Sequence, residues 1–349
     1  MNKLILALCI AISLTACSFF VGEPSRVENP IIRGIHYVGL TVSDLDQASK
    51  LLSDSFDLAA VENEAINNST VIDTLAGRSG VSINSRLMRS VNGQLRLMQF
   101  ADPSEAAGQT LRTEVYGPGF SHACFQVNHE TQAYQNFLAG GGTHVGSEDM
   151  VQLNPRNPVY YAYARNQDET MFEIEHVDVA KLDLPEPPKN KYRFRHIALA
   201  SPDIDRLVKF YSVLLEYENP RRLGRLFAMS GEKFDDVSGL SDAALKMAFF
   251  DVRNMELEIA QITSHPTDSP TSPRPLDALG YNMIVFDVTD LAAAKEKLLA
   301  AGGSVITEPT AMDGGQIFFG RDIDSNLLGF QVLEAGSPLS AQNFADNGI

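Results

Sequence analysis

Hydrophobic and polar residues recur along this chain in matching patterns. The stretches "HYVGLTVSDLDQASKLLSDSF", from His36, and "RHIALASPDIDRLVKFYSVLL", from Arg195, each contain a short apolar run and then apolar residues at helical spacing. Each stretch therefore predicts a strand followed by an amphipathic helix. Ser43 and the pair Ser201-Pro202 are suited to begin these helices, as N-cap and first-turn residues.

The residues that follow the two helices also match, without a gap. The stretch "LAGRSGVSINSRLMRSVNGQLRLMQF" aligns with "VSGLSDAALKMAFFDVRNMELEIAQI", so that Gly77 meets Gly239 and Leu95 meets Leu257. Both continuations have the apolar content of further strands. The chain therefore repeats one unit, which we call a module: a strand, a helix and further strands.

Two more modules match each other. The stretch "HACFQVNHETQAYQNFLAGGGTHV", from His122, aligns without a gap with "MIVFDVTDLAAAKEKLLAAGGSVI", from Met283. Each predicts a strand, a helix and a Gly-Gly pair of the kind that ends helices. Their continuations, "YARNQDETMFEIEH" and "FGRDIDSNLLGFQV", share an arginine, an aspartate and a final apolar strand.

Composition shifts mark the boundaries between these parts. The stretch "KLDLPEPPKNK" is a Pro-rich, charged linker, and we expect the residues after Ala335 to be disordered. The predicted divisions are a signal peptide 1–16, a tether 17–30, modules one and two in 31–180, a linker 181–191, modules three and four in 192–335, and a tail 336–349.

The N-terminus has the pattern of a secretory signal. Lys3 precedes an apolar run from Leu4 to Leu14, which is too short to span a membrane. The following "LTAC" resembles a bacterial lipobox, which implies lipidation of Cys17 and removal of the residues before it. Ser18 in place of aspartate then implies the outer membrane. We predict a cell-envelope protein, lipid-anchored and facing the periplasm.

The cysteine count bears on disulfide bonding, and the net charge bears on the kind of binding partner. Of the three cysteines, Cys9 leaves with the signal and Cys17 carries the lipid, so Cys124 has no intramolecular partner. The net charge of −16 becomes −17 when Lys3 is removed, because residues 1–16 contain no other charge. An acidic chain of this kind is not expected to bind nucleic acid.

The four modules together resemble the vicinal oxygen chelate (VOC) superfamily of glyoxalase, bleomycin-resistance and extradiol-dioxygenase proteins. The resemblance extends from Ile31 to Glu334 and implies an α+β fold, with four βαβββ modules forming two VOC domains with curved mixed sheets. In this superfamily two modules pair around a hollow that holds a divalent metal ion. Its ligands come from the first and last strand of each module.

The module alignment identifies the equivalent positions in this chain. The first-strand position is occupied, in module order, by Tyr37, His122, His196 and Met283. The last-strand position is occupied by Arg96, Glu173, Glu258 and Gly329. Only the two middle modules therefore keep a histidine and a glutamate.

How the modules pair decides whether a metal site exists. If modules one and two paired, each hollow would offer only two ligands, whereas three or four are usual. Crossed pairing, as the resemblance to four-module, single-chain glyoxalase I enzymes implies, would collect the four metal ligands His122, Glu173, His196 and Glu258. Modules one and four would then form a metal-free pocket lined by Tyr37, Arg96, Met283 and Gly329.

These four ligands suit metal-assisted chemistry on a small molecule. Two imidazoles and two carboxylates hold one divalent ion (Ni, Zn, Fe, Mn or Co) and leave two coordination positions for neighbouring substrate oxygens. The resemblance implies stabilisation of an enediolate, and either Glu173 or Glu258 could be the catalytic base. No other cofactor is expected.

Several nearby residues have competing interpretations. A one-residue slip of the alignment would place His36 with His122 and Glu173, as in extradiol dioxygenases, but strand alternation argues against it. We interpret Tyr161 and Tyr163 as aromatic fillers of a strand, with a position lining the pocket as the alternative. Cys124 is interpreted as a core residue, with a thiol ligand as the alternative. Glu175 and Glu256 fit a solvent-facing strand surface.

Three functions remain open. The first is a metal-dependent, glyoxalase-like lyase or isomerase; because export separates the protein from cytoplasmic glutathione-type substrates, its substrate would be another hydroxycarbonyl, hemithioacetal or 2-oxo compound. The second is an extradiol-type iron dioxygenase that uses three of the four ligands. The third is a metal-free binding protein for small molecules, in which both histidines are structural.

Overall fold

The computed structural model describes residues 23–182 and 191–344. Module one contains β2 (Ile32–Thr41), α1 (Leu45–Phe56), β3 (Ala59–Asn67), α2 (Thr70–Ala76), β4 (Ser82–Arg89) and β5 (Gln94–Phe100). Module two contains α3 (Glu105–Gln109), β6 (Gly119–Asn128), η1 (His129–Thr131), α4 (Ala133–Ala139), β7 (Thr143–His144), β8 (Val159–Arg165), β9 (Met171–Val177) and η2 (Val179–Lys181).

The later half repeats this order. Module three contains β10 (Tyr192–Ala200), α5 (Ile204–Leu214), β11 (Tyr217–Glu218), β12 (Arg221–Leu223), β13 (Met229–Ser230), α6 (Glu232–Ser238), β14 (Ala244–Asp251) and β15 (Glu256–Ile262). Module four contains β16 (Gly280–Val288), α7 (Leu291–Ala301), β17 (Ser304–Val305), β18 (Thr310–Met312), β19 (Gly315–Arg321) and β20 (Leu327–Leu333). Two short elements lie outside the modules: β1 (Ser25–Arg26) and η3 (Ala341–Asn343).

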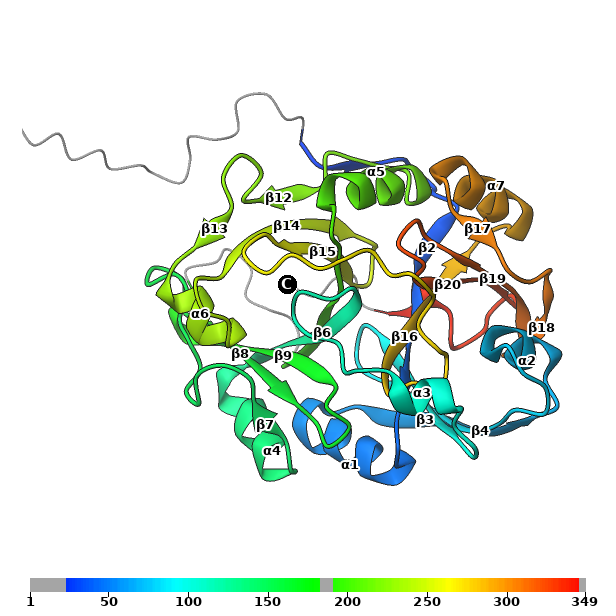
Figure 1. Ribbon diagram of the computed structural model, residues 1–349, viewed down its shortest axis with the longest axis horizontal. Coiled ribbons are helices and arrows are strands. Elements are labelled where there is room, and N and C mark those ends of the chain that lie inside the picture. The colour runs from blue at the N-terminus through cyan, green and yellow to red at the C-terminus, as the bar shows by residue number, and fades with distance from the viewer. Residues whose placement is uncertain (1–22, 183–190, 345–349) are drawn as a thin grey trace, which may run out of the picture.

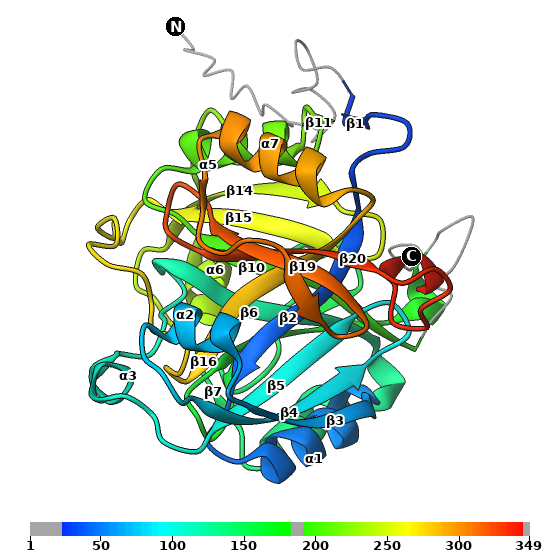
Figure 2. The ribbon, with the colours of Figure 1, turned by 90° about the vertical axis from the view of Figure 1, so that its right-hand side faces the viewer.

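The strands form two nine-stranded mixed sheets, and each combines an early with a late module (Figures 1 and 2). The first, which we call the inner sheet, has the order β12-β14-β15-β10-β6-β9-β8-β7, with β13 on β14. The second, the outer sheet, has the order β17-β19-β20-β16-β2-β5-β4-β3, with β18 on β19. The α+β fold class is therefore as predicted, and the modules pair crosswise.

The crossed pairing means that the two halves of the chain share both sheets. The antiparallel pair β6–β10 joins modules two and three, and the pair β2–β16 joins modules one and four. Segments 31–180 and 192–335 consequently do not form separate sheets. The predicted signal peptide 1–16 and Cys17 lie outside the described residues, as do residues 183–190 of the predicted linker.

One face of each sheet packs on a shared apolar core. Alternate residues of β6 show the division: Ala123 and Phe125 belong to this core, whereas His122 and Cys124 lie on the opposite face. Helices α1 and α4 pack together at one end of the core, and α5 and α7 pack together at the other (Figure 1). The hollow of each sheet is left on the side away from this core.

The helices begin slightly later than the sequence indicated. Asp44 is the N-cap of α1 and Asp203 the N-cap of α5, and each carboxylate accepts a backbone N–H three residues on. The predicted caps, Ser43 and Ser201, instead donate their hydroxyls to the side chains of Asp168 and Asp324. The cap prediction was wrong because each serine hydroxyl bonds an aspartate of another module, and the local sequence does not show that partner.

The tail is ordered over much of its length, contrary to our expectation. Ala341 and Phe344 are buried, and the backbone N–H of Ala341 donates to Asp287 at 2.9 Å. Arg253 donates to the carbonyl of Ala341 at 2.6 Å. The tail therefore contributes small apolar surface to the core, a role that its polar composition concealed. Residues 345–349 lie outside the described part of the chain.

None of the helices within the described residues is long and apolar enough to cross a membrane.

Candidate metal centre

The same register relates the first and last strands in all four modules. In every module, the residue two places after the first-strand ligand position lies opposite the last-strand ligand position on the neighbouring parallel strand. The pairs are Gly39 with Arg96, Cys124 with Glu173, Ala198 with Glu258, and Val285 with Gly329. This regularity confirms that the module alignment is correct, and that Glu258 rather than Glu256 is equivalent to Glu173.

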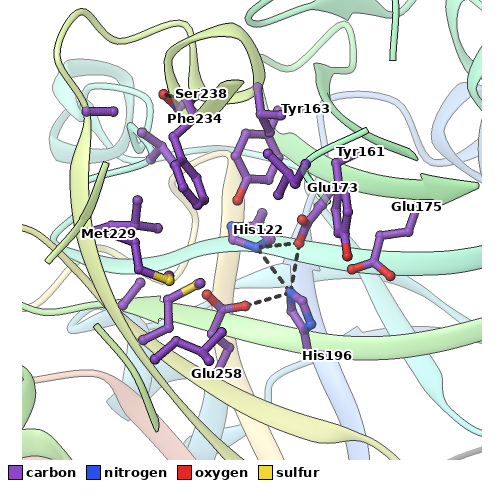
Figure 3. Close-up of a pocket in the computed structure, with 18 of the residues that line it drawn as sticks. His122, Tyr161, Tyr163, Glu173, Glu175, His196, Met229, Phe234, Ser238 and Glu258 are labelled. Carbon is purple, nitrogen blue, oxygen red and sulfur yellow. Dashed lines mark hydrogen bonds and ion pairs between the residues drawn. The ribbon is translucent and has the colours of Figure 1, made fainter. Parts of the chain in front are cut away.

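The inner sheet brings the four predicted ligands together at its centre (Figure 3). His122 lies on β6 and His196 on β10, which are neighbours, and the glutamates lie on the flanking strands β9 and β15. The two Nε2 atoms are 3.2 Å apart. Glu173 Oε2 lies 3.2 Å from Nε2 of His122 and 3.0 Å from that of His196, and Glu258 Oε2 lies 2.9 Å from His196.

These separations match the spacing of ligands around one metal ion. All four ligand atoms lie within 4.8 Å of one another. Two ligands bound at right angles to an ion with bonds of about 2.1 Å are about 3 Å apart, close to the separations found here. The residues therefore fit a divalent ion, and the nitrogen and oxygen donors suit Ni, Zn, Fe, Mn or Co.

The electrostatics of the cluster favour a cation. Burial alone would lower the pKa of His196, but the carboxylates of Glu258 and Glu173 outweigh it and raise the pKa to about 9. Burial alone would raise the pKa of Glu173, but hydrogen bonds from His122 and His196 hold it well below its usual range. Two buried carboxylates thus create a negative site that a proton or a metal ion can neutralise.

Neighbouring groups orient the two imidazoles. Ser121 Oγ lies 3.0 Å from Nδ1 of His122, which directs the Nε2 atom of that ring towards the cluster. The ring of Tyr163 packs at 4.9 Å from the ring of His122. Phe249 meets the ring of His196 edge-on at 6.1 Å. The ligands are therefore held by packing on both sides.

The cluster forms part of the wall of a pocket of about 350 Å³. Tyr161 and Tyr163 line this pocket, which is the alternative that we ranked second to their role as strand fillers. Apolar side chains supply much of the remaining wall: Val115, Leu153, Leu223, Met229, Phe234, Val237, Leu245, Met247, Phe249 and Ile262. The pocket is thus suited to a small molecule with an apolar body and a polar end at the histidines and glutamates.

A buried ion pair beside the ligands was missed from the sequence. Glu175 is fully buried and pairs with Arg195, which also reaches Glu256 at 3.2 Å. These glutamates are therefore not a solvent-facing surface. The register of β10 shifts between Phe194 and His196, which marks a bulge, and both Arg195 and His196 line the pocket. No sequence pattern indicated this bulge.

The alternative triad with His36 is not assembled. His36 lies in the outer sheet, where its Nδ1 is 2.7 Å from Oε1 of Gln331. Among the described residues, close groups of potential ligands are the four above and a set of Cys124, Glu173 and Glu175. Cys124 is fully buried, and burial raises the pKa of its thiol well above the usual value. It is buried, as we expected, but on the face of β6 that carries His122 and not in the shared apolar core.

The equivalent positions of the outer modules also gather, but the space around them is filled. Tyr37 and Met283 belong to a second apolar cluster, and a Cβ added at Gly329 would meet Val285 at 2.8 Å. The guanidinium of Arg96 lies over the ring of Tyr37 at 4.8 Å and pairs with Asp313 at 2.9 Å. The predicted second pocket is therefore occupied by its own side chains.

Comparisons with known proteins agree with this architecture. Residues 193–330 match the model of the Glyoxalase/Bleomycin resistance protein/Dioxygenase superfamily, so this segment carries a domain of that superfamily. No relative was found among curated proteins.

Two solved structures share the fold over most of the chain. Glyoxalase I from Zea mays is 16% identical, with 88% of this chain and 93% of that chain covered and a TM-score of 0.57. A candidate dioxygenase from Bacillus subtilis is 9% identical, with 89% and 87% covered and a TM-score of 0.55. At these identities the likeness shows a common fold.

Proposed function

We propose that the chain is a metal-dependent enzyme of the glyoxalase type, an isomerase or lyase that acts on a small molecule with neighbouring oxygens, such as a hydroxycarbonyl or 2-oxo compound. The observation that carries this proposal is the convergence of four nitrogen and oxygen ligand atoms within 4.8 Å in the wall of a pocket. The shared fold with maize glyoxalase I supports it.

Different residues of the pocket would have different roles in the reaction. A bound divalent ion would polarise a substrate oxygen and stabilise negative charge that develops there. Glu173 or Glu258 would accept the proton from the carbon next to the carbonyl and return it to the neighbouring atom. Tyr163 packs against His122 and limits access of water to that side. The apolar wall would bind the rest of the substrate.

Metal binding tests the proposal directly. The purified chain, supplemented with each of the five ions in turn, should bind one divalent ion per chain, measured by calorimetry and elemental analysis. His122→Ala and His196→Ala should each weaken binding about a hundredfold or more, because each removes a ligand. His144→Ala is the matched control, since His144 is exposed. A wild-type chain that binds none of these ions would favour the metal-free binding protein.

Paired glutamine variants test the role of the glutamates. If one carboxylate is the base, Glu173→Gln or Glu258→Gln should lower turnover by about two to four orders of magnitude while a metal ion remains bound. Exchange of solvent deuterium into the substrate carbon reports proton transfer separately from product formation. Unchanged exchange in both variants would show that neither glutamate is the base.

An iron-dependent dioxygenase is the second candidate. The shared fold with the Bacillus subtilis structure favours it, and three of the four ligands would suffice. Oxygen uptake with catechols in the presence of iron(II) would support this function. Turnover with redox-inert zinc or nickel would exclude it.

We also propose that the protein is a lipoprotein of the cell envelope, on the strength of the "LTAC" sequence at Cys17. A lipidated cysteine carries at least two acyl chains, which is enough for stable anchoring. Cys17→Ala should move the protein from the membrane fraction to the soluble fraction. Unchanged retention, together with no incorporation of labelled lipid in the wild type, would refute the anchor.

A further inference from the structure

The loop between β12 and β13, residues 224–228, presents two large apolar side chains to solvent. Leu226 is 77% exposed and Phe227 is 86% exposed. Isolated apolar residues are common on protein surfaces and need no explanation. An adjacent leucine and phenylalanine at the tip of a loop are different, because both lose apolar contact with the protein and together form one projecting patch.

Three arginines lie close to this tip in the sequence, although the chain as a whole carries a net charge of −16 and Arg222 is paired with Asp205 at 2.7 Å. Arg221, Arg222 and Arg225 precede Leu226 within five residues, and Lys233 follows. Arg221 retains partial exposure while it pairs with Glu256 at 3.2 Å, and Arg225 is exposed. An apolar tip flanked by arginines is the arrangement that binds at the interface of an anionic lipid layer.

The loop stands at the pocket that contains the candidate metal centre. Leu223 and Met229, at its two ends, line that pocket. Both strands pair with β14 near one edge of the inner sheet, and Figure 1 shows β13 close to α6. A surface that held the loop tip would therefore lie close to the pocket entrance.

The N-terminal segment reaches the same side of the molecule. β1 pairs with β11, so that Ser25 lies opposite Glu218 and Arg26 opposite Tyr217. β11 ends three residues before Arg221, where β12 begins. In Figure 1 the first described residues, in blue, run along the same edge as β12. Cys17, the proposed lipidation site, precedes Ser25 by eight residues, so a lipid there would keep Ser25 within about 30 Å of the membrane surface.

We propose that the 224–228 loop inserts into an anionic lipid surface through Leu226 and Phe227, with Arg221 and Arg225 on the lipid headgroups. The protein would then sit on the membrane with the pocket entrance near the lipid, and apolar substrates dissolved in the bilayer would reach the pocket directly. This inference draws on the proposed lipid anchor at Cys17, but it depends neither on metal binding nor on the reaction proposed above.

The absence of tryptophan from the sequence allows a direct test. Phe227→Trp introduces the chain's sole tryptophan at the loop tip, and Leu111→Trp is the matched control because Leu111 is 85% exposed on a different loop. With the full chain and vesicles of phosphatidylglycerol and phosphatidylcholine, emission from Phe227→Trp should shift to the blue, and quenching by acrylamide should fall about threefold or more. Leu111→Trp should show neither change.

Further measurements separate the competing explanations. Arg225→Gln, added to Phe227→Trp, should weaken the shift on anionic vesicles, and vesicles of phosphatidylcholine alone should produce a smaller one. Full access of acrylamide to Phe227→Trp on vesicle-bound protein would overturn the proposal. Shielding without vesicles would also overturn it, because the tip would then pack on the protein itself or on a second copy.

Discussion

Arg96 occupies, in the outer modules, the position that Glu173 and Glu258 occupy in the inner ones. The exchange of a carboxylate for a guanidinium reverses the charge at the centre of the hollow, and Tyr37 replaces the histidine beneath it. Asp313, almost fully buried, supplies the counter-charge at 2.9 Å. The outer hollow therefore carries its own cation, held by packing and an ion pair, at the place where the inner hollow would hold a metal.

His36 lies beside this ion pair and should make stability depend on pH. Its Nδ1–H donates to Gln331, and its Nε2 has no hydrogen-bond partner among the described residues. Burial, with a further effect of the Arg96 charge, lowers the pKa of His36 from 6.5 to about 3. Folding thus requires the neutral ring, and the unfolded chain binds the proton more tightly.

We therefore expect the contribution of His36 to stability to be complete above pH 6.5 and to be lost as the pH falls towards 3. The loss should be about 1.4 kcal/mol for each pH unit in this range. His36→Gln keeps a donor for Gln331 but cannot titrate, so its unfolding free energy should fall less steeply below pH 6.5. Urea unfolding of both proteins from pH 4 to pH 8 measures the difference. If the unfolding free energies of the two proteins fell equally steeply with pH, His36 would not be the group responsible.

The elements of the inner sheet place the ligands, and helix α5 packs against β15, the strand that carries Glu258. Its N-cap is Asp203, whose carboxylate accepts the backbone N–H of Arg206 at 3.0 Å. The buried face of the helix packs on the core next to β14 and β15. The cap matters because a helix of this length depends on its ends as well as on its packing.

Asp203→Ala should therefore destabilise the protein by about 1 kcal/mol, whereas Asp203→Asn should retain most of the stability because asparagine is also a good N-cap. Thermal or urea unfolding of the two variants tests this directly. Equal losses in both would show that the charge of Asp203, rather than its cap hydrogen bond, is what the helix needs.

For the whole molecule, crossed pairing makes the two halves of the chain interdependent. Separation of the halves would split the inner sheet between β6 and β10 and the outer sheet between β2 and β16. Each half would keep one histidine and one glutamate of the candidate metal centre. Neither half could then bind a divalent ion through a complete set of ligands.

A protease site placed within residues 183–190 tests this dependence. After cleavage we expect the two fragments to remain together on a sizing column without denaturant, and to retain the metal affinity of the intact chain. The affinity should disappear when the fragments are separated in urea and refolded singly. Fragments that come apart in buffer would show that the shared sheets do not hold the halves together.

Local sequence determined much of this protein. The gapless matches between modules identified equivalent strand positions, because a period-two strand pattern fixes which side chains share a face. The resemblance to VOC proteins implied ligands on the first and last strand of each module, and the alignment assigned these positions to His122, Glu173, His196 and Glu258. The burial of Cys124 was likewise expected correctly.

Tertiary structure decided the features that depend on partners distant in the chain. Contacts with other modules determine three such features. These are the bulge at Arg195, the use of Asp203 instead of Ser201 as the helix cap, and the burial of Phe344. The filling of the outer hollow depends on Asp313, which lies in a hairpin far along the chain from Arg96. Sequence patterns report which face a residue takes, whereas the strands that meet across a sheet are set by the packing of the whole chain.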